Sequence, residues 1–305
     1  MREWKKWEIK KLPKSQWPPG IRRVKPAIKQ LNYRGEWDKK IFAKAVAVVG
    51  SRMMTKYGEI MTEKLVGGLV GAGYTIVSGF MYGVDTMAHR VCLENKGRTV
   101  AVLGSGLDCL TPAENDNLYT QILEDGGLVM SEFEANQEAR LWTFPYRNRI
   151  VTGLSQAVMV VEAGEKSGSL VTAKWAFKQG KKVMAVPGAA TSGLAMGTNW
   201  LIRNGAVLVS SVNEVMEELG APHSRGKAGK NNQGLRGMRP SEINMSLEER
   251  EVVELLKNEV MDADELSRKL KKNITEVLVV LSNLGLKGVV EESGGKFMIG
   301  LDYAD

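Results

Sequence analysis

The stretch Val46-Ala47-Val48-Val49-Gly50-Ser51-Arg52 decides the fold expected for this chain of 305 residues. Its first four residues are all apolar and either β-branched or small, which is typical of a strand buried on both faces of a parallel sheet. A glycine, a hydroxyl group and an arginine follow directly, where the strand ends. Because ligands of parallel sheets bind at the carboxyl ends of the strands, the stretch predicts both a sheet and the edge that carries its site.

The same alternation of a short apolar strand and a longer helical stretch repeats through residues 46–219. Helices are expected over residues 56–72, 83–94 and 170–179, among others. The expected strands cover residues 46–49, 74–77, 99–103, 127–130, 157–161, 182–186 and 206–209. This repetition predicts an α/β fold with a Rossmann-like, doubly wound and mostly parallel sheet.

Residues 65–84 form a run of twenty positions without a charged residue, which is long enough for a membrane span. Six glycines interrupt the run, so we expect a helix end, a turn and a strand there instead. The two cysteines, Cys92 and Cys109, lie in apolar surroundings, and the N-terminus lacks the apolar stretch of a signal peptide. These features predict a cytoplasmic protein without disulfides or membrane contact.

The net charge of +7 is unevenly distributed along the chain. Residues 1–45 carry 14 basic and 4 acidic residues, and residues 220–240 carry five basic and no acidic residues. We therefore expect a basic N-terminal arm over residues 1–45, the Rossmann-like core over 46–219 and a basic linker over 220–240. A basic arm suits a phosphate backbone, although a solvated tail that aids solubility explains the charge equally well.

Polar or glycine-rich residues follow six of the expected strands, and the parallel fold brings all six groups to one edge. Backbone amides in such turns bind phosphate groups, especially at a helix N-terminus. The dinucleotide fingerprint and the P-loop are both absent from these turns. The six groups are Gly50-Ser51-Arg52, Ser78-Gly79, Gly104-Ser105-Gly106, Ser131-Glu132, Glu162 with Ser167-Gly168-Ser169, and Pro187-Gly188.

Two arginines, an amide and two aromatic residues lie together in Phe144-Pro145-Tyr146-Arg147-Asn148-Arg149. Arginine offers a planar set of donors to phosphate, and aromatic faces offer stacking surfaces to bases. If the fold brings this segment close to Arg52, the result is a groove for single-stranded nucleic acid. Alternatively, Arg147 and Arg149 pair with Glu132 and Glu162 in a structural network.

The residues outside this groove offer little for catalysis. Asp85 and His89 share a helix face, but the only other histidine is His223, so a structural anchor is a better interpretation than an acid–base pair or a metal site. Glu132 and Glu162 end adjacent expected strands and form either a carboxylate pair or two loop-positioning groups. We therefore expect no catalytic residue, no metal and no cofactor.

Residues 241–305 change character and predict a small winged-helix domain. Helices are expected from Ser246, from Asp262 and from Asn273, the last two with capping-box spacing, and a hairpin follows around Ser293-Gly294-Gly295. The domain carries 8 basic and 14 acidic residues, and its third helix has almost no basic residue. Since an acidic module repels phosphate, we expect it to contact protein or to regulate the core rather than to bind duplex DNA.

The motifs along residues 46–219 resemble, in order and as a set, the DprA/Smf family, the DNA-processing proteins of natural transformation. The resemblance rests on residues 46–52, 78–79 with 83–85 and 88–89, 104–106, 131–132, 144–150, 161–163, 167–173, 185–188 and 197–202. The C-terminal domain is similar to that family's winged helix. Many members carry an N-terminal helical domain, for which the 45 residues before this core are too few.

The resemblance implies a non-enzymatic protein that binds single-stranded DNA, forms a homodimer and loads the recombinase RecA on exposed single strands. It implies DNA contacts by Arg52 and the 147–149 segment, with Phe144 or Tyr146 available to stack, and it adds Lys174 as a weaker candidate. The full set of expected DNA-binding residues is Gly50, Ser51, Arg52, Ser78, Gly79, Gly104, Ser105, Gly106, Phe144, Tyr146, Arg147, Asn148, Arg149, Ser167, Gly168, Ser169 and Lys174.

Two other function classes remain open. The first is a nucleoside-monophosphate phosphoribohydrolase of the lysine-decarboxylase-like fold, which has similar loops at the same edge. That family usually shows Pro-Gly-Gly-x-Gly-Thr, and neither residues 162–169 nor Pro187-Gly188 fit the pattern. The second is a nucleotide-sensing regulator that binds duplex DNA through its winged helix, which the acidic charge of that domain disfavours.

Overall fold

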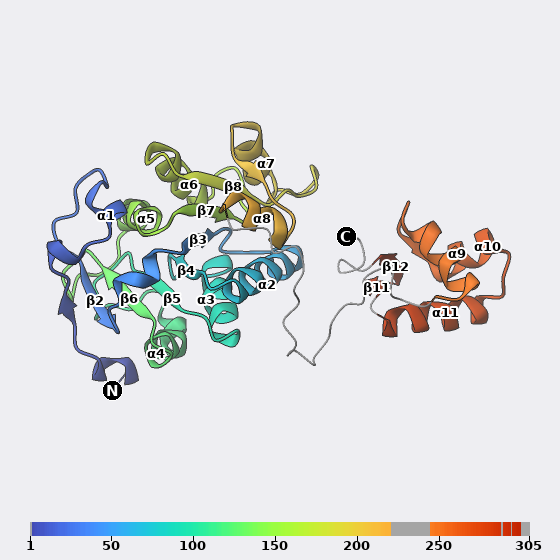
Figure 1. The fold of residues 1–305 in the computed structure, drawn as a ribbon, viewed down its shortest axis with the longest axis horizontal. Coiled ribbons are helices and arrows are strands. Elements are labelled where there is room, and N and C mark those ends of the chain that lie inside the picture. Colours follow the sequence, from blue (N-terminus) through green and yellow to red (C-terminus); the bar gives the residue numbers. More distant parts are fainter. Residues whose placement is uncertain (1, 221–244, 288, 294, 300–305) are drawn as a thin grey trace. The chain divides into compact units, whose positions relative to one another are not determined.

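The computed structural model describes residues 2–220, 245–287, 289–293 and 295–299, and it divides the chain into two compact units (Figure 1). The larger unit contains the described residues up to Gly220, and the smaller one contains those from Met245 onward. The expected basic linker lies outside the described residues, apart from Gly220.

The larger unit is built on a nine-stranded sheet in the order β1-β2-β6-β5-β4-β3-β7-β8-β9. β1 pairs with β2 and β2 with β6 in antiparallel fashion, and the remaining pairs are parallel, with Val46 opposite both Ile76 and Ala157. The strands are β1 (Lys10–Lys11), β2 (Asn32–Gly35), β3 (Ala45–Val49), β4 (Thr75–Ser78), β5 (Thr99–Val102), β6 (Leu128–Ser131), β7 (Ala157–Val160), β8 (Lys182–Ala185) and β9 (Val207–Leu208). This confirms the predicted Rossmann-like sheet and all seven predicted strands.

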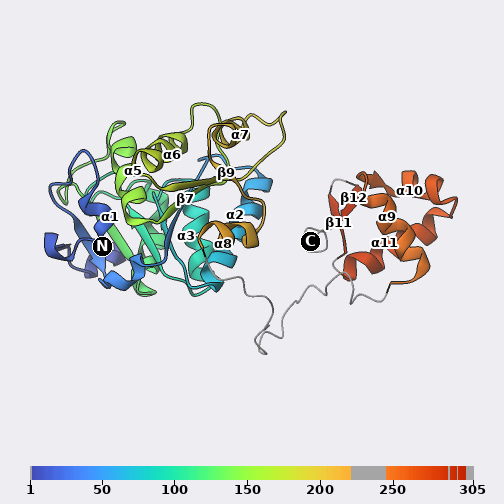
Figure 2. The same ribbon diagram turned by 45° about the horizontal axis from the view of Figure 1, so that its top comes forward.

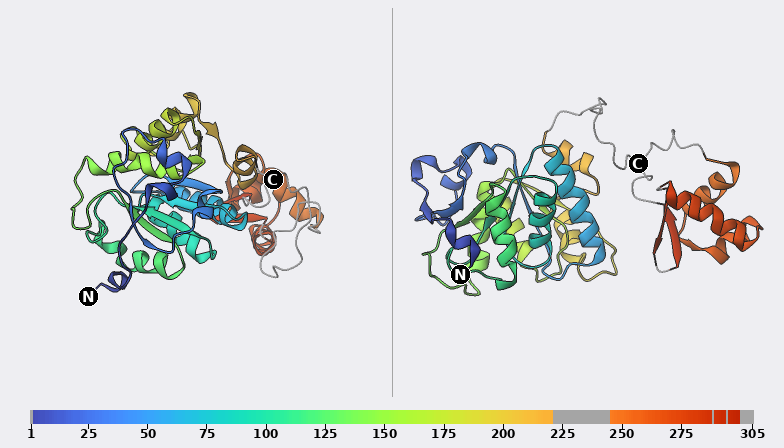
Figure 3. Two further views of the ribbon diagram at one scale, coloured as in Figure 1. Left: turned by 60° about the vertical axis from the view of Figure 1, so that its left-hand side comes forward. Right: turned by 90° about the horizontal axis from the view of Figure 1, so that it is seen from below.

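Helices cover both faces of the sheet, with α5 and α6 on one side and α2, α3 and α8 on the other (Figure 2). On the second face, α2, α3 and α4 lie side by side, coloured blue to green in the right-hand view of Figure 3. The helices are α1 (Pro19–Arg22), α2 (Lys56–Gly71), α3 (Val84–Glu94), α4 (Asp116–Glu124), α5 (Thr143–Leu154), α6 (Gly168–Lys178), α7 (Met196–Arg203) and α8 (Val212–Glu218). Short 3-10 turns occur at Glu3–Lys6, Lys14–Gln16, Lys39–Phe42 and Ala113–Asn115.

The central strand β3 explains why the sheet needs cover on both faces. Its five residues are all buried, and they alternate between the two cores: Ala45, Ala47 and Val49 lie in one, and Val46 and Val48 in the other. A strand between two helical layers has no polar face, which is why it appears in the sequence as an unbroken apolar run.

The charge-free run over residues 65–84 divides as predicted between the end of α2, β4 and the loop that follows. Within the ranges that the structure describes, no helix is both long and apolar enough to cross a membrane.

The smaller unit has the three helices and the hairpin predicted for a winged helix. They are α9 (Leu247–Leu256), α10 (Ala263–Leu270) and α11 (Ile274–Leu286), with a sheet of β10 (Met261–Asp262), β12 (Lys296–Ile299) and β11 (Val290–Ser293) in that order. Capping boxes begin α9 at Ser246 and α10 at Asp262, whereas Asn273 caps α11 by accepting a hydrogen bond from the amide of Thr275.

The N-terminal segment, residues 2–44, differs from the basic arm expected from its charge, because it is part of the larger unit. β2 extends the main sheet beside β6, and β1 pairs with β2 at its edge. Eight hydrophobic residues of the segment are buried, namely Trp4, Leu12, Trp17, Ile21, Val24, Ile28, Leu31 and Ile41. They are scattered among basic residues without helical or strand periodicity. The number of charged residues therefore gave no indication that these side chains belong to the core.

Trp4 attaches the beginning of the segment to the core. Its side chain is fully buried and stacks on Tyr119, with ring centres 4.6 Å apart, and its Nε1 donates a hydrogen bond to Asp116 at 2.8 Å. The guanidinium of Arg34, a residue of β2, lies 4.8 Å from the centre of the Trp4 ring. Aromatic packing therefore holds the start of the segment against the core. The basic residues beside Trp4 are fixed in position by the same contacts.

We predict that Trp4→Ala lowers the free energy of unfolding by about 3–5 kcal/mol, because it empties a site for a large aromatic side chain in a packed core. Urea denaturation followed by circular dichroism measures the change. Trp200→Ala is the matched control, since Trp200 is 47% exposed and its loss should cost about 0.5 kcal/mol or less. Equal stability of the Trp4 variant and the wild type would contradict the packing of this segment.

Candidate nucleic-acid interface

A pocket of about 570 Å³ opens at the carboxyl ends of β3, β4 and β7, and we call it the switch-point pocket. The chain leaves β3 in one direction toward β4, while β7 lies on the other side of β3, so the loops of these strands diverge there. Such a divergence is where open α/β sheets bind ligands. The pocket is lined by residues 49–53, by Gly79, Met81, Tyr82 and Asp85, by residues of the 141–151 stretch, and by residues of the 164–172 stretch with Leu194.

The loop after β3 holds Arg52 at the mouth of the pocket. Ser51 is buried; its Oγ accepts a hydrogen bond from the amide of Met53 at 3.1 Å, and its carbonyl accepts one from the amide of Val84 at 3.1 Å. Gly83 allows this approach, because its φ is 70° and a Cβ there would lie 2.2 Å from the Ser51 carbonyl oxygen. Arg52 itself is exposed.

Arg147 forms the floor of the pocket and is only 2% exposed. Its Nη1 donates hydrogen bonds to the carbonyl groups of Gly79, directly after β4, and Val102, the last residue of β5. Burial lowers the pKa of Arg147 to about 10, while the nearby Asp85 carboxylate favours its charged form. Burial also raises the pKa of Asp85, against the opposing effect of Arg147. The two side chains therefore hold the loop after β4 in place.

Phe144 stands between the pocket and the loop after β5. The guanidinium carbon of Arg52 lies 5.5 Å from the centre of the Phe144 ring, within the range of a cation–π contact. Gly104 makes room for the ring, because a Cβ at that position would lie 2.9 Å from Cδ1 of Phe144. The half-buried ring and the exposed cation together form one wall of the pocket.

The N-terminus of α6 forms the opposite wall. Ser167 caps this helix through a hydrogen bond from the amide of Ser169 to its Oγ, and the two hydroxyl groups lie 2.7 Å apart. Asn148 donates a hydrogen bond from Nδ2 to the carbonyl of Gly168 at 3.4 Å, which connects α5 to α6. With the exposed Lys166 beside it, this helix end combines amide groups, hydroxyl groups and a cation.

Glu162, at the end of β7, fixes the loop that carries Arg52. Its carboxylate accepts hydrogen bonds from the amide of Thr55 at 2.8 Å and from the hydroxyl of the same residue. The possible carboxylate pair of Glu162 and Glu132 is not formed, because β5, β4 and β3 lie between β6 and β7. The structure supports the other interpretation for Glu162, in which its carboxylate positions a loop, here the loop after β3.

Arg149 faces away from the pocket and supports the structural alternative for this arginine. Its guanidinium is fully buried and donates from Nη2 to the carboxylate of Glu132 at 2.7 Å and from Nε to the carbonyl of Pro26 at 3.1 Å. The Tyr146 ring centre lies 3.7 Å from the Arg149 guanidinium carbon. Removing one partner of a buried ion pair costs about 3–5 kcal/mol, so the pair belongs to the framework that supports α5.

Ten of the seventeen expected DNA-binding residues line the switch-point pocket: Gly50, Ser51, Arg52, Gly79, Phe144, Arg147, Asn148, Ser167, Gly168 and Ser169. Lys174 is exposed on α6 outside the lining, whereas Ser78, Gly104, Ser105, Gly106 and Arg149 are buried and Tyr146 is half-buried. The Gly104–Gly106 turn is occupied by the protein itself, since the hydroxyl of Ser105 donates to the carbonyl of Cys109 and the amide of Gly106 donates to that of Gln137. DNA contact by any of these residues stays a prediction.

Sequence analysis did not identify several residues of the lining. Lys166 had a detectable signal, because it directly precedes the Ser167-Gly168-Ser169 turn. Met53 and Leu141 are 81% and 92% exposed and are apolar, which no strand or helix pattern would mark as part of a site. Tyr82 is exposed as well and donates its hydroxyl to the carboxylate of Glu114 at 2.7 Å.

His89 is a buried anchor, as the sequence predicted. Its Nδ1 lies 2.7 Å from the hydroxyl of Thr99, which in turn donates to the carbonyl of Ile76, so Nδ1 carries the donated proton. Nε2 is buried without a partner, and burial lowers the pKa of His89 to about 3. Across the part of the chain that the structure describes, no group of three or more metal-binding side chains is gathered.

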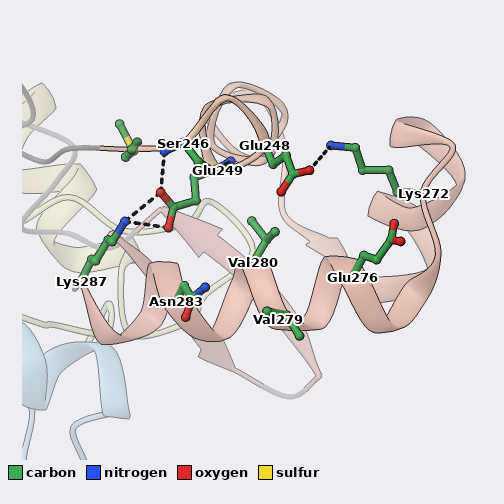
Figure 4. Close-up of a pocket in the computed structure, with 10 residues that line it drawn as sticks. Ser246, Glu248, Glu249, Lys272, Glu276, Val279, Val280, Asn283 and Lys287 are labelled. Carbon is green, nitrogen blue, oxygen red and sulfur yellow. Dashed lines mark hydrogen bonds and ion pairs between the residues drawn. The ribbon is translucent and has the colours of Figure 1, made fainter.

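A second pocket, of about 670 Å³, lies in the smaller unit between α9 and α11 (Figure 4). Two lysines line it, and both pair with glutamates: Lys287 lies 2.7 Å from Glu249, and Lys272 lies 3.0 Å from Glu251. Glu248 and Glu276 also face the pocket. The lining thus holds three glutamates and two lysines, a charge balance that disfavours phosphate and agrees with the acidic composition from which a protein-contact role was predicted.

Comparisons with known proteins identify both units. The family model of DNA recombination-mediator protein A matches residues 9–220, and that of the DprA winged helix domain matches residues 238–296.

Curated relatives are similar over part of their length. Protein Smf of Escherichia coli (strain K12) is 36% identical over 254 residues, which cover 83% of this chain and 67% of that protein. DNA processing protein DprA of Streptococcus pneumoniae is 44% identical over 188 residues, covering 62% of this chain and 66% of the relative. Protein Smf of Synechocystis is 44% identical over 176 residues, covering 58% of this chain and 44% of the relative.

Two solved structures share the fold. DNA processing protein A from Streptococcus pneumoniae matches with a TM-score of 0.64 and 37% identity over 71% of this chain and 75% of that one. DNA processing protein A from Helicobacter pylori, studied for its single-stranded DNA binding mode, matches with a TM-score of 0.63 and 29% identity over 70% of this chain and 96% of that one.

We predict that the free energy of unfolding falls as the pH decreases from about 6.5 to about 3, partly because of His89. In that range the unfolded chain binds a proton at His89 and the folded protein does not, which favours unfolding. His89→Gln keeps an N–H donor for Thr99 and should flatten the dependence by a few kcal/mol, since one pKa unit corresponds to about 1.4 kcal/mol. Urea denaturation across the range measures this, with His223→Gln as the control; equal slopes for wild type and His89→Gln would contradict it.

Proposed function

The chain belongs to the DNA recombination-mediator protein A family, and from this premise we propose that it binds single-stranded DNA in the switch-point pocket. We propose further that it acts as a binding protein without catalysis of its own. The observation that carries the proposal is the placement of an exposed arginine, an aromatic ring and a helix N-terminus around one pocket. Arg52, Phe144 and Ser167 represent these three parts.

Each part supplies one component of binding. The Arg52 guanidinium and the Lys166 ammonium attract phosphate groups, and the amide and hydroxyl groups at the start of α6 add directed donors. The Phe144 ring offers a face for a base, and stacking of this kind is worth about 1–3 kcal/mol per base without regard to sequence. A base in duplex DNA is already stacked and paired, so the ring favours a single strand.

The scaffold around the pocket suits a rigid binding site. Arg147 and Asp85 hold the loop after β4, and Glu162 holds the loop after β3. These titratable side chains are already engaged by protein donors or carbonyl groups, which leaves them poorly suited to proton transfer. The Helicobacter pylori relative is described as binding single-stranded DNA, which supports the same class of ligand here.

We also propose that the protein forms a homodimer and loads RecA on single strands, as the family resemblance implies. A dimer places two pockets on one strand and raises avidity without new contacts. We expect sedimentation equilibrium to give twice the monomer mass and the protein to shorten the lag of RecA filament assembly on oligo-dT. A monomer at all concentrations, or an unchanged lag, would contradict this part alone.

We predict that Arg52→Ala lowers the affinity for labelled oligo-dT by about tenfold and reduces the salt slope of log K by about 0.7, the value for one lost phosphate contact with a single strand. Phe144→Ala should lower the affinity by the stacking energy of one base while leaving the salt slope unchanged. Fluorescence anisotropy across a salt series measures both effects. Arg90→Ala removes an exposed arginine outside the pocket and serves as the matched control.

A duplex of matched sequence completes the experiment. Weaker binding of the duplex supports a single-strand site. If both DNAs bind with equal affinity and neither variant changes it, the DNA-binding site lies on the basic N-terminal segment instead. If neither DNA binds, the proposal fails, and hydrolysis of nucleoside monophosphates becomes the function to test.

A further inference from the structure

We infer that the bound strand continues from the switch-point pocket into an adjoining pocket of the larger unit, which Arg2 and Lys5 help to form. This inference rests on the proposed function and extends the length of strand that the protein holds. This adjoining pocket has a volume of about 830 Å³, and we call it the terminal pocket because Arg2 and Lys5 line it.

The two pockets adjoin at two side chains. Leu141 and Phe144 line both the switch-point pocket and the terminal pocket. Leu141 is 92% exposed, and the neighbouring Trp142 is 52% exposed. An apolar, partly aromatic ridge with a pocket on either side is suited to unpaired bases, because each base has an apolar face.

The charges of the terminal pocket favour a phosphate backbone. Three exposed cations line it, namely Arg2, Lys5 and Arg140. Two carboxylates also line it, but that of Asp108 pairs with Arg34 at 2.8 Å, which leaves Glu138 as the main opposing charge. The excess of positive charge continues that of Arg52 and Lys166 along the surface.

The three cations lie on backbone that the core holds in place. The buried ring of Trp4 fixes the segment between Arg2 and Lys5. The amide of Arg140 donates to the hydroxyl of Thr143, and that hydroxyl donates back to the Arg140 carbonyl, at the start of α5. Arg2 also lies 3.5 Å from Asp116, an exposed ion pair whose loss has little effect on stability.

The occupant to which these features point is the continuing part of the same single strand. A bound strand needs cations repeated along its path and apolar surfaces between them, and the two adjoining pockets supply both. Arg2 and Lys5 precede residues 9–220, which the family model matches, whereas Arg140 and the other residues that line the pocket lie within that range.

The test compares a short and a long oligo-dT, of about 4 and about 16 nucleotides, which span the usual site sizes of single-strand binders. The triple variant Arg2→Ala/Lys5→Ala/Arg140→Ala should bind the long oligonucleotide about tenfold more weakly and with a smaller salt slope, and should bind the short one like the wild type. Arg52→Ala should weaken binding of both lengths.

The matched control is Lys10→Ala/Lys11→Ala/Lys29→Ala, which removes three exposed cations from the same segment but outside both pockets. If the triple variant binds the long oligonucleotide like the wild type while Arg52→Ala does not, the terminal subsite is overturned and the proposed function stands. If the triple variant changes only self-association, the terminal pocket is an interface between copies, which also overturns the inference. If the wild type binds neither length, both proposals fail.

Discussion

The geometry of the candidate site depends on the hydrogen bonds that the buried guanidinium of Arg147 donates. A cation removed from water needs acceptors, and here they are the carbonyl groups of Gly79, directly after β4, and of Val102, at the end of β5, with the Asp85 carboxylate nearby. This places the first turns of α5 over the central strand ends. Phe144 and Asn148, on the same helix, then face the pocket and the start of α6 as a consequence.

The other charged groups divide into those that build the scaffold and those that are exposed to solvent. Glu162 holds the loop after β3, and Glu132 neutralises Arg149 behind α5. Arg52 and Lys166 are exposed at the pocket instead. A rigid frame with exposed cations suits a ligand that carries its own negative charges in series, because little reorganisation is needed when it binds.

Most of the fold could be predicted because burial leaves a direct mark on the sequence. A strand covered on both faces is apolar throughout, so the seven parallel strands were recognisable one by one. β2 was not recognisable, because it lies between β6 and the short edge strand β1, alternates in burial and carries Arg34 among its buried residues. In the same way, Trp4 and Leu12 belong to the core although their neighbours are lysines, since each packs through a contact distant in sequence.

The sequence by itself determined the alternation of strands and helices, the capped helices of the C-terminal unit, and the set of polar turns that follow the strands. Only the tertiary structure decided which of those turns meet. Strand order separates Glu132 from Glu162, and the path of α5 buries Arg147 and Arg149 while Arg52 remains in solvent. The physical reason is that residue type records whether a group is charged, whereas its solvent exposure depends on long-range packing between elements that no local pattern contains.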